Sequence, residues 1–425
     1  MKIKPDKPLS FKRLLLVALM CIMLMPGFLQ AQTPKKAKIP VRTTYKIIDS
    51  IIEHYVKQGN FSGVVTLAEK NKTTYNKAYG LANMELNIKN DTSTRFEIGS
   101  MSKQFCAALV LIAESEGKIS LDSCLYKYLP YTKSASSGFG AVTIHQLLSM
   151  RSAIPSYDNF PNFITTVARR NFRSHEEFIL DQCGYPLQTT PGTAFSYSDG
   201  NYYILGAVLE KLYGATYAKI LDDKIFKPLK MDDSGFLKLS GDPNGGEIVK
   251  NLNEGYQPIT KTYDPATGLP IASHYQHGSW TNMSDIAFSS GAIYMTGADF
   301  IKWTVALNNN TLFPAKYREQ MFTSYSDNGG VLEGYYPTKP GCPPTGYGFA
   351  MVIVHRPALP GTTTPLKIFT HGGLTPGYSS VGAMVDGHDI SIFITSNINS
   401  DAPLFMCWQI MNTLLGVPPN YGGIP

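Results

Sequence analysis

Cysteine is scarce in this chain of 425 residues, and its spacing excludes several kinds of site. The six cysteines are widely spaced and include no CxxC pair. This argues against a zinc or redox site built on paired cysteines. Removal of an N-terminal leader containing Cys21 would leave an odd number, so a complete disulfide framework is not expected. Cys106 lies in an apolar run and is predicted to be a buried free thiol.

Clusters of metal-ligating residues are also lacking. His274 and His277 in "HYQH" are the one close pair of histidines, and they have no evident third ligand. The stretch around them is polar and contains glycine and proline, so we interpret it as a loop. Neither a metal nor another cofactor is expected.

The N-terminal apolar run is too short to span a bilayer. The stretch "LLLVALMCIMLM" follows five basic residues and stops at Pro26, whereas a spanning helix needs about 20 apolar residues. The stretch "FLQAQT" comes next, with small Ala31 before Gln32. This pattern predicts a signal peptide over residues 1–31, so the protein is expected to be exported, periplasmic or extracellular, without a stable membrane anchor after cleavage.

A strong excess of charge of one sign is absent from the mature chain. The formal net charge is +6, but residues 1–31 hold five basic residues and one acidic residue, so it falls to +2 after cleavage. No long basic block interleaved with aromatics is present, which excludes nucleic acid as a partner. Residues 32–43, with "QTPKKAKIP", are interpreted as a linker. Residues 44–420 are predicted to form one globular domain.

Hydrophobic periodicity predicts the first elements of this domain. "TTYKIIDSIIEHYVKQG" has helical spacing and ends at Gly59. "FSGVVTLAEK" and "TTYNKAYG" indicate two strands of a hairpin. Residues 101–115 are apolar on nearly every face, which predicts a helix buried all round and capped by Gly117.

Later segments complete the predicted fold class. The middle third contains helical stretches separated by long loops, and the C-terminal third returns to strands before a final apolar helix. The helical stretches are "TIHQLLSM", "YYILGAVLEKLYG" and "PLFMCWQIMNTLLG", and the strands are "YGFAMVIVH", "LKIFTHGG", "YSSVGAMVDG" and "HDISIFITSN". Strands at both ends predict an α/β protein of the α+β type, with a mostly antiparallel sheet built from both termini and flanked by helices. A helical region is inserted at roughly residues 101–280, and a site between it and the sheet would lie in a cleft.

Ser100 and Lys103 in "FEIGSMSKQF" stand where the most apolar helix begins. Residues three apart on a helix are neighbours, so the amine of Lys103 can reach the hydroxyl of Ser100. A serine needs a base to become a nucleophile. A lysine serves as that base only in its neutral form, which burial or nearby cations favour. The alternative is a solvated charge at the start of a helix.

The same spacing occurs a second time, at Ser115 and Lys118 in "SEGK". This copy lies at the end of the predicted helix beside Gly117, where a solvated lysine is favoured. Spacing alone is therefore a weak signal. Only the first copy stands at a helix N-terminus, where free N–H groups favour developing negative charge.

A run of ordered motifs resembles a known family. "RFEIGSMSKQF" is similar to the nucleophile motif of the serine β-lactamase and penicillin-binding-protein superfamily, in its class C β-lactamase-related branch. The other motifs follow in the expected order from roughly residue 44 to 416. They are "GKISLDSCLYKYLP", "VTIHQLLSM", "PGTAFSYSDGNYYILGAVLEKLYG", "SSGAIYMTGADFIKW", "GYGFAM" and "FTHGGLTPGYSS".

The resemblance implies roles for individual residues. Ser100 would be the nucleophile, Lys103 would help to deprotonate it, and Tyr197 would act as a base in acylation and as a proton donor to the leaving group. The family leaves open whether the lysine or the tyrosine holds the critical proton. The N–H groups of Ser100 and Leu374 would form the oxyanion hole. The implied substrate-binding residues are Asp199, His371, Gly372 and Gly373.

This chain departs from the family pattern at several positions. Asp199 replaces an asparagine, and its negative charge would favour a charged Lys103 and shift the role of base toward Tyr197. His371 replaces the lysine of true class C β-lactamases and is mostly neutral at about pH 7, which weakens recognition of a substrate carboxylate. Met150 and Ala153 replace a histidine and a glycine in a loop near the cleft.

These features together predict an exported serine hydrolase that forms an acyl-enzyme on Ser100. Its substrates would be small esters or amides, such as D-amino-acid peptides or β-lactam-like compounds, bound as a small molecule or peptide. The alternative is a penicillin-binding receptor or pseudoenzyme that is acylated, or binds peptide, without turnover. An α/β-hydrolase is disfavoured, because "GYSSVG" has Val381 where the second glycine of a G-x-S-x-G elbow belongs. The aromatic-rich segment 255–280 is predicted to line or cover the cleft.

Overall fold

The structure is a computed structural model, which describes residues 41–134, 138–157, 174–237, 248–259, 262–263, 271–278, 287–326 and 342–418. The predicted signal peptide and residues 32–40 of the predicted linker lie outside these ranges. In the described part of the chain, no helix combines the length and the apolar character needed to cross a membrane.

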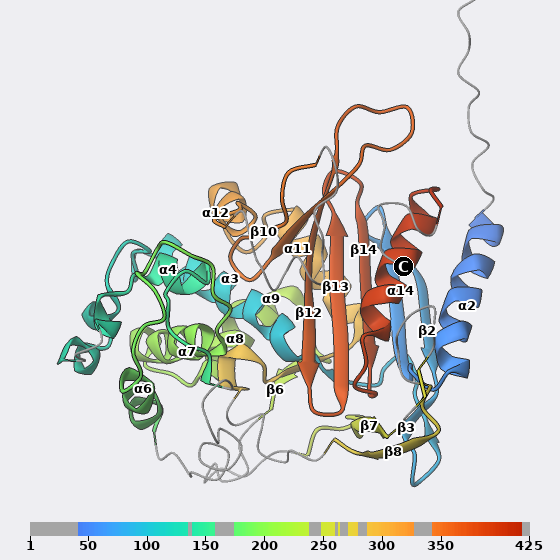
Figure 1. Ribbon diagram of the computed structural model, residues 1–425, viewed down its shortest axis with the longest axis horizontal. Coiled ribbons are helices and arrows are strands. Elements are labelled where there is room, and N and C mark those ends of the chain that lie inside the picture. Colours follow the sequence, from blue (N-terminus) through green and yellow to red (C-terminus); the bar gives the residue numbers. More distant parts are fainter. Residues whose placement is uncertain are drawn as a thin grey trace, which may run out of the picture. The chain divides into compact units, whose positions relative to one another are not determined.

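The central feature is a seven-stranded antiparallel sheet with the strand order β10-β11-β12-β13-β14-β1-β2 (Figure 1). Its strands are β1 (Gly63–Glu69), β2 (Lys72–Tyr79), β10 (Gly346–Tyr347), β11 (Val352–Arg356), β12 (Leu366–Thr375), β13 (Tyr378–Val385) and β14 (Ile390–Ser396). β1 pairs with β14 from Gly63 opposite Ser396 to Glu69 opposite Ile390. The N-terminal hairpin is thus joined to the C-terminal strands, which confirms the predicted sheet assembled from both termini.

Helices cover both faces of this sheet. β13 and β14 are buried at every position, which requires cover on each side. Helices α2 (Val41–Lys57) and α14 (Ala402–Leu414) contact each other, and α14 packs on β13 and β14. Helix α11 (Gly297–Asn308) packs on β14 and β1, where the ring of Phe300 stacks on Phe393 with centroids 4.3 Å apart. The core is therefore continuous around the sheet.

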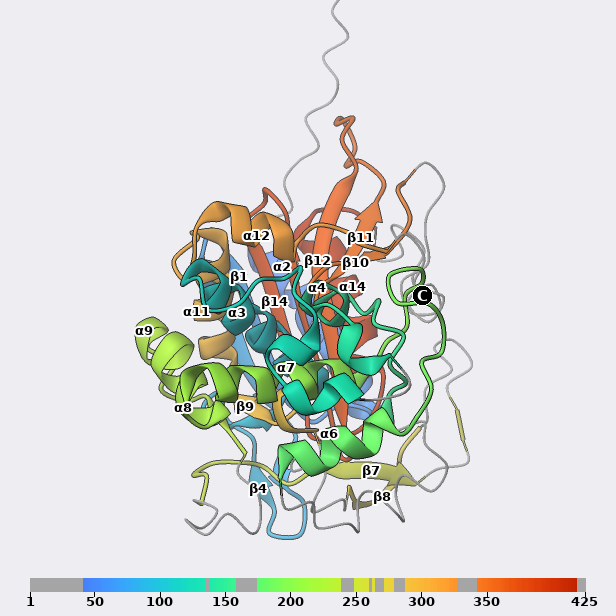
Figure 2. The ribbon, with the colours of Figure 1, turned by 90° about the vertical axis from the view of Figure 1, so that its left-hand side faces the viewer.

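The inserted helices stand beside β12, in front of the sheet in Figure 2. They are α3 (Ser102–Ser115), α4 (Ile144–Leu148), α6 (His175–Cys183), α7 (Asp199–Tyr213), α8 (Tyr217–Leu221) and α9 (Lys227–Leu229). Helix α12 (Ala315–Met321), which follows α11 in the chain, also contacts α3. Every residue of α3 from Ser102 to Ala113 is buried, and Gly117 adopts a left-handed conformation with φ +70°. The predicted helix buried all round, with its glycine cap, is confirmed.

Three small sheets complete the fold. They are the three-stranded sheet β5 (Phe96–Glu97), β9 (Ile293–Met295) and β6 (Gly235–Phe236), and the pairs β3 (Leu81–Asn83) with β4 (Ile88–Lys89) and β7 (Tyr256–Ile259) with β8 (His274–His277). The strand β5 leads directly into Ser100. The β7–β8 pair meets the turn after β12, because Tyr256 N–H donates to the carbonyl of Gly377 over 3.1 Å.

Two sequence predictions about strands were wrong. "HYQH" is not a loop but strand β8, because it pairs with β7, which lies earlier in the chain. "YGFAMVIVH" is not one strand, since a tight bend separates β10 from β11. Ala350 has φ +57° in that bend, and the N–H of Gly348 donates to the carbonyl of Met351 over 2.8 Å. The five cysteines in the described segments are free thiols, and Cys106 is fully buried as predicted.

Candidate functional site

Ser100 lies in a single turn of 3-10 helix, Gly99–Met101, between strand β5 and helix α3. The turn begins at Gly99, which has φ +51°. A Cβ atom at Gly99 would lie 2.8 Å from the backbone nitrogen of Leu374 on β12, so only glycine lets the two segments come this close. Ser100 is partly exposed.

Lys103, the second residue of helix α3, is fully buried, and its ammonium group has three acceptors. Its Nζ atom donates to Ser100 Oγ over 2.9 Å and to the carbonyl of Ser290 over 2.9 Å, and it forms an ion pair with Asp199 Oδ1. These acceptors satisfy all three N–H donors of an ammonium. The contact between Lys103 and Ser100 that the spacing predicts is present, and Lys103 is not a solvated charge.

The second serine and lysine pair has a different environment. Ser115 is exposed and donates to the carbonyl of Ile112 over 2.7 Å. Lys118 is exposed, with Nζ 5.5 Å from the centre of the Tyr213 ring. This pair is an ordinary helix end, as the sequence indicated.

Asp199 and Tyr197 reach the site from the start of helix α7. Asp199 is the first residue of α7, where the helix dipole favours a carboxylate, and its N–H donates to Ser156 Oγ over 3.0 Å. Tyr197 precedes the helix and is partly buried. The Nζ atom of Lys103 lies 5.2 Å from the centre of the Tyr197 ring. The structure thus brings both residues to Lys103.

Met150 and Ala153, the departures in the loop before α7, adopt unusual backbone conformations. Both have positive φ, +56° and +61°. The Sδ atom of Met150 accepts hydrogen bonds from Ser198 N–H and from Asn201 Nδ2, each over 3.4 Å. Met150 therefore supports the residues that begin α7, although its thioether is a weak acceptor.

His371 lies on β12 at 4% exposure, and both of its ring nitrogens have partners. Nδ1 is 2.6 Å from the carbonyl of Gly372, and Nε2 is 3.2 Å from the hydroxyl of Tyr347. A carbonyl can only accept, so Nδ1 carries the proton and Nε2 accepts from Tyr347. Burial, and then the positive charge of Lys103, lowers the pKa of His371 to about 4. The ring is neutral at physiological pH.

Tyr347 is a site residue that sequence reasoning missed. It lies on β10, is fully buried, and its ring centroid is 6.4 Å from that of Tyr197. The motif "GYGFAM" marked this stretch, but only the folded sheet shows that its tyrosine meets His371. The carbonyl of Ser290, the third partner of Lys103, was likewise not foreseen.

The end of β12 runs beside the turn that holds Ser100. A Cβ atom at Gly373 would lie 1.9 Å from the carbonyl oxygen of Ile98, so this strand needs glycine at that position. Leu374 follows and is 53% exposed. The N–H groups of Ser100 and Leu374 thus belong to adjoining segments, as a two-donor oxyanion hole requires.

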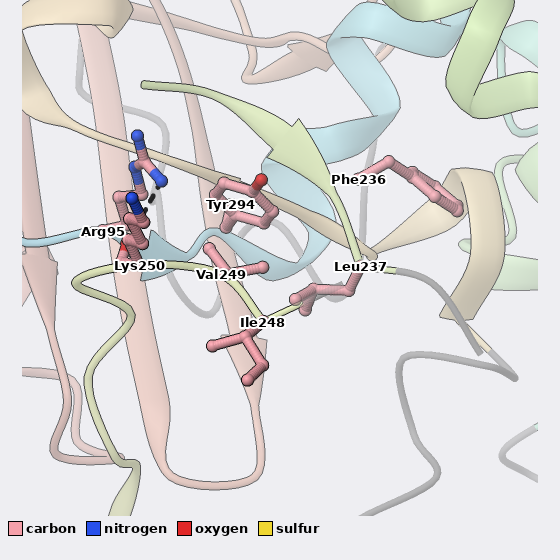
Figure 3. Close-up of a pocket in the computed structure, with 7 residues that line it drawn as sticks. All are labelled: Arg95, Phe236, Leu237, Ile248, Val249, Lys250 and Tyr294. Atoms are coloured by element: carbon pink, nitrogen blue, oxygen red, sulfur yellow. Dashed lines mark hydrogen bonds between the residues drawn. The ribbon is translucent and has the colours of Figure 1, made fainter. Parts of the chain in front are cut away.

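A cavity of about 290 Å³ lies away from these residues, on the small β5-β9-β6 sheet (Figure 3). Its lining consists of Arg95, Phe236, Leu237, Ile248, Val249, Lys250 and Tyr294. None of these is a predicted site residue. Among the described residues, no group of three or more His, Cys, Asp or Glu side chains is arranged to hold a metal ion.

Solved structures with the same fold include hydrolases and penicillin-binding proteins. The penicillin-binding protein from Bacillus halodurans superposes with a TM-score of 0.67 and 20% identity, over 87% of this chain and 99% of that one. The D-stereospecific amidohydrolase from Streptomyces sp. gives 0.66 and 22%, over 83% and 94%. The D-amino acid amidase from Ochrobactrum anthropi SV3 gives 0.66 and 18%, over 88% and 98%. This chain therefore shares its fold with these three proteins.

Sequence comparison identifies the family. The chain matches the Beta-lactamase family over residues 48–409 and belongs to it. It is 24% identical to the putative penicillin-binding protein PbpX of Bacillus subtilis (strain 168), over 88% of this chain and 79% of that protein. It is also 24% identical to protein flp of Staphylococcus aureus (strain MW2), over 83% of this chain and 63% of flp. Family membership, with Ser100 and Lys103 in contact, supports a serine hydrolase.

Proposed function

We propose that this protein is an exported serine hydrolase that forms an acyl-enzyme on Ser100 from small esters or amides. The observation that carries the proposal is the 2.9 Å contact between Ser100 Oγ and the buried Lys103 Nζ. A buried amine beside a partly exposed hydroxyl is arranged to exchange a proton with it. The predicted leader over residues 1–31 supports export.

The reaction would proceed in two steps. Ser100 Oγ attacks the substrate carbonyl carbon as its proton passes to Lys103 or Tyr197, and the resulting oxyanion accepts hydrogen bonds from the N–H groups of Ser100 and Leu374. Collapse of this intermediate breaks the bond to the leaving group, which takes up the proton. A water molecule then attacks the ester carbonyl, releases the acid and returns the proton to Ser100.

Asp199 influences which group acts as the base. Its carboxylate pairs with Lys103 and favours the charged ammonium, which cannot accept a proton. The centre of the Tyr197 ring lies 5.2 Å from that ammonium, and Tyr197 would be the base while Lys103 stays charged. The ammonium would then stabilise the phenolate electrostatically.

His371 restricts the substrate. A neutral and buried ring whose two nitrogens are occupied supplies no cation for a substrate carboxylate. We therefore favour substrates without a free carboxylate near the scissile bond, such as D-amino-acid amides, D-peptides bound by their N-terminal part, and esters. The D-stereospecific amidohydrolase and the D-amino acid amidase among the structural neighbours support this choice. Hydrolysis of β-lactams would be secondary.

The second candidate function is a penicillin-binding receptor that is acylated but not turned over. It is favoured by the ion pair of Lys103 with Asp199, because a lysine held as ammonium is a poor base for the deacylating water. The name of PbpX as a putative penicillin-binding protein is consistent with it. The two functions differ only in the rate of the second step.

Intact-mass spectrometry tests these functions. The mature protein would be exposed to a p-nitrophenyl ester, a D-alanyl amide and a penicillin, with product release followed in parallel. Ser100→Ala removes the nucleophile, and Ser115→Ala is the matched control because Ser115 has the same spacing to a lysine. Turnover that is lost only in Ser100→Ala supports the hydrolase. A stable adduct on Ser100 without turnover supports the receptor, and no adduct with any probe contradicts both.

A further inference from the structure

Two side chains join the strand that leads into Ser100 to the hairpin that carries Leu374. The hydroxyl of Ser380 on β13 donates to the carbonyl of Ile98 over 2.9 Å. The hydroxyl of Thr375, the residue after Leu374, donates to Glu97 Oε2 over 3.2 Å. Along the hairpin these contacts flank Leu374, because Ser380 lies opposite Gly373 and Thr375 follows Leu374. They tie the segment just before the Ser100 turn to the β12–β13 hairpin.

Glu97 binds Thr375 in surroundings that contain no paired cation. The side chain is partly buried on β5, opposite Tyr294 of β9. Glu254, in the segment before β7, adds a negative charge nearby. In the described segments no salt bridge reaches Glu97, and the guanidinium of neighbouring Arg95 is turned to Asp233, 2.7 Å away. Among the described residues, the Glu97 carboxylate has one hydrogen-bond partner, the hydroxyl of Thr375.

Tyr378 of β13 is a second titratable residue close enough to Glu97 to feel its charge. It is buried, and burial together with the charges of Glu97 and Glu254 raises its pKa, so it is neutral over the working range. Its hydroxyl donates to the carbonyl of Asn253 over 2.6 Å and is not shared with Glu97. The group that titrates beside Thr375 is therefore Glu97, modulated by Glu254.

We propose that Glu97 is a positioning residue for the oxyanion hole, which acts through Thr375 to hold the Leu374 amide against the Ser100 turn. This role rests on the proposed function, since it concerns the same reaction. A carboxylate accepts the Thr375 hydroxyl more strongly than a neutral acid does, because hydrogen bonds to charged groups are the stronger ones. Ionisation of Glu97 therefore tightens the end of β12.

Glu97 changes its charge within the pH range in which activity is measured. Burial, with a smaller contribution from Glu254, raises the pKa of Glu97 to about 7, against the opposing effect of Thr375. Above that pH the carboxylate holds Thr375, and below it the contact weakens. Loss of a complete oxyanion donor costs about 100- to 1,000-fold in kcat, so a displaced donor is expected to cost about 3- to 10-fold.

The first test follows the NMR chemical shift of the Leu374 amide with pH and does not depend on activity. The protein would be labelled with 15N-leucine, the Leu374 resonance identified by its loss in Leu374→Ile, and its shift followed from pH 5.5 to 8.5. A titration near pH 7 that disappears in Glu97→Gln and in Thr375→Val supports the proposal. The matched control is Glu69→Gln, because Glu69 accepts a threonine hydroxyl, that of Thr74, over 3.4 Å on strands remote from Ser100.

The second test uses kcat/KM on an uncharged ester. We expect the ratio of wild type to Glu97→Gln to be about 3 to 10 at pH 8.5 and near 1 at pH 5.5, with Thr375→Ser active and Thr375→Val impaired. A ratio that does not change with pH overturns the proposal, as does a Leu374 shift that titrates equally in Glu97→Gln. An enzyme that forms no adduct on Ser100 contradicts the proposed function instead, and the Leu374 titration still decides the role of Glu97.

Discussion

Replacement of His371 by glutamine removes a buried titratable group and should flatten the dependence of stability on pH. The pKa of His371 is about 4 in the folded protein, against 6.5 for an ordinary histidine. Between these values the unfolded chain binds more protons, so the free energy of unfolding rises with pH and the contribution of the neutral ring is complete above 6.5. At about 1.4 kcal/mol per pKa unit, wild type should lose about 2.5 kcal/mol relative to His371→Gln between pH 8 and pH 4.5.

The assay is urea unfolding followed by circular dichroism at several pH values. The difference in the free energy of unfolding between wild type and variant isolates the contribution of His371. This is necessary because Glu97 changes the free energy of unfolding with pH in the opposite direction. The pKa of Glu97 is raised to about 7, so its contribution falls as pH rises from 4.5 to 7, and the wild-type profile alone would look flat there. His388→Gln, at an exposed histidine, is the control and should follow wild type. A difference of constant size across the pH range would refute a neutral, buried His371.

Three further substitutions test the site. Asp199→Asn removes the carboxylate that pairs with Lys103, so the rising limb of kcat/KM should move to lower pH; an unchanged profile contradicts this. Tyr347→Phe leaves Nε2 of His371 without its donor and should lower the free energy of unfolding by about 1 to 3 kcal/mol, measured with urea. Gly373→Ala places a Cβ atom 1.9 Å from a backbone oxygen. We expect it to lower Tm and abolish acylation, and a wild-type melting curve would show that the strand can move.

The sequence predicted those parts of the fold and site that depend on local spacing. Lys103 reaches Ser100 because residues three apart face each other at the start of a helix. Helix α3 was recognisable because it is apolar on every face, and β13 and β14 because they are continuous apolar runs. The order of the family motifs placed Tyr197, Asp199 and His371 in the same site.

The remaining features depend on contacts between distant segments, which periodicity does not reveal. "HYQH" forms a strand because it pairs with β7. The bend at Ala350 needs a left-handed backbone conformation, which the sequence does not indicate because the residue there is alanine and not glycine. Tyr347 meets His371, and Glu97 meets Thr375, across gaps of 24 and 278 residues. A single sequence does not indicate these contacts between distant residues, because each of the four residues taken alone is compatible with an ordinary strand position.

The pairing of β1 with β14 has a consequence for the order of folding. Gly63 and Ser396 are opposite each other although 333 positions separate them, so the sheet closes only after almost the whole chain is available. Contacts of such long range are slow to form, because loop closure must precede any gain from pairing. Ser100 and Leu374 meet through the same closure. Acylation by a fast-reacting probe would thus report the last stage of folding, and a truncated chain that lacks β14 should remain unreactive however much helix it contains.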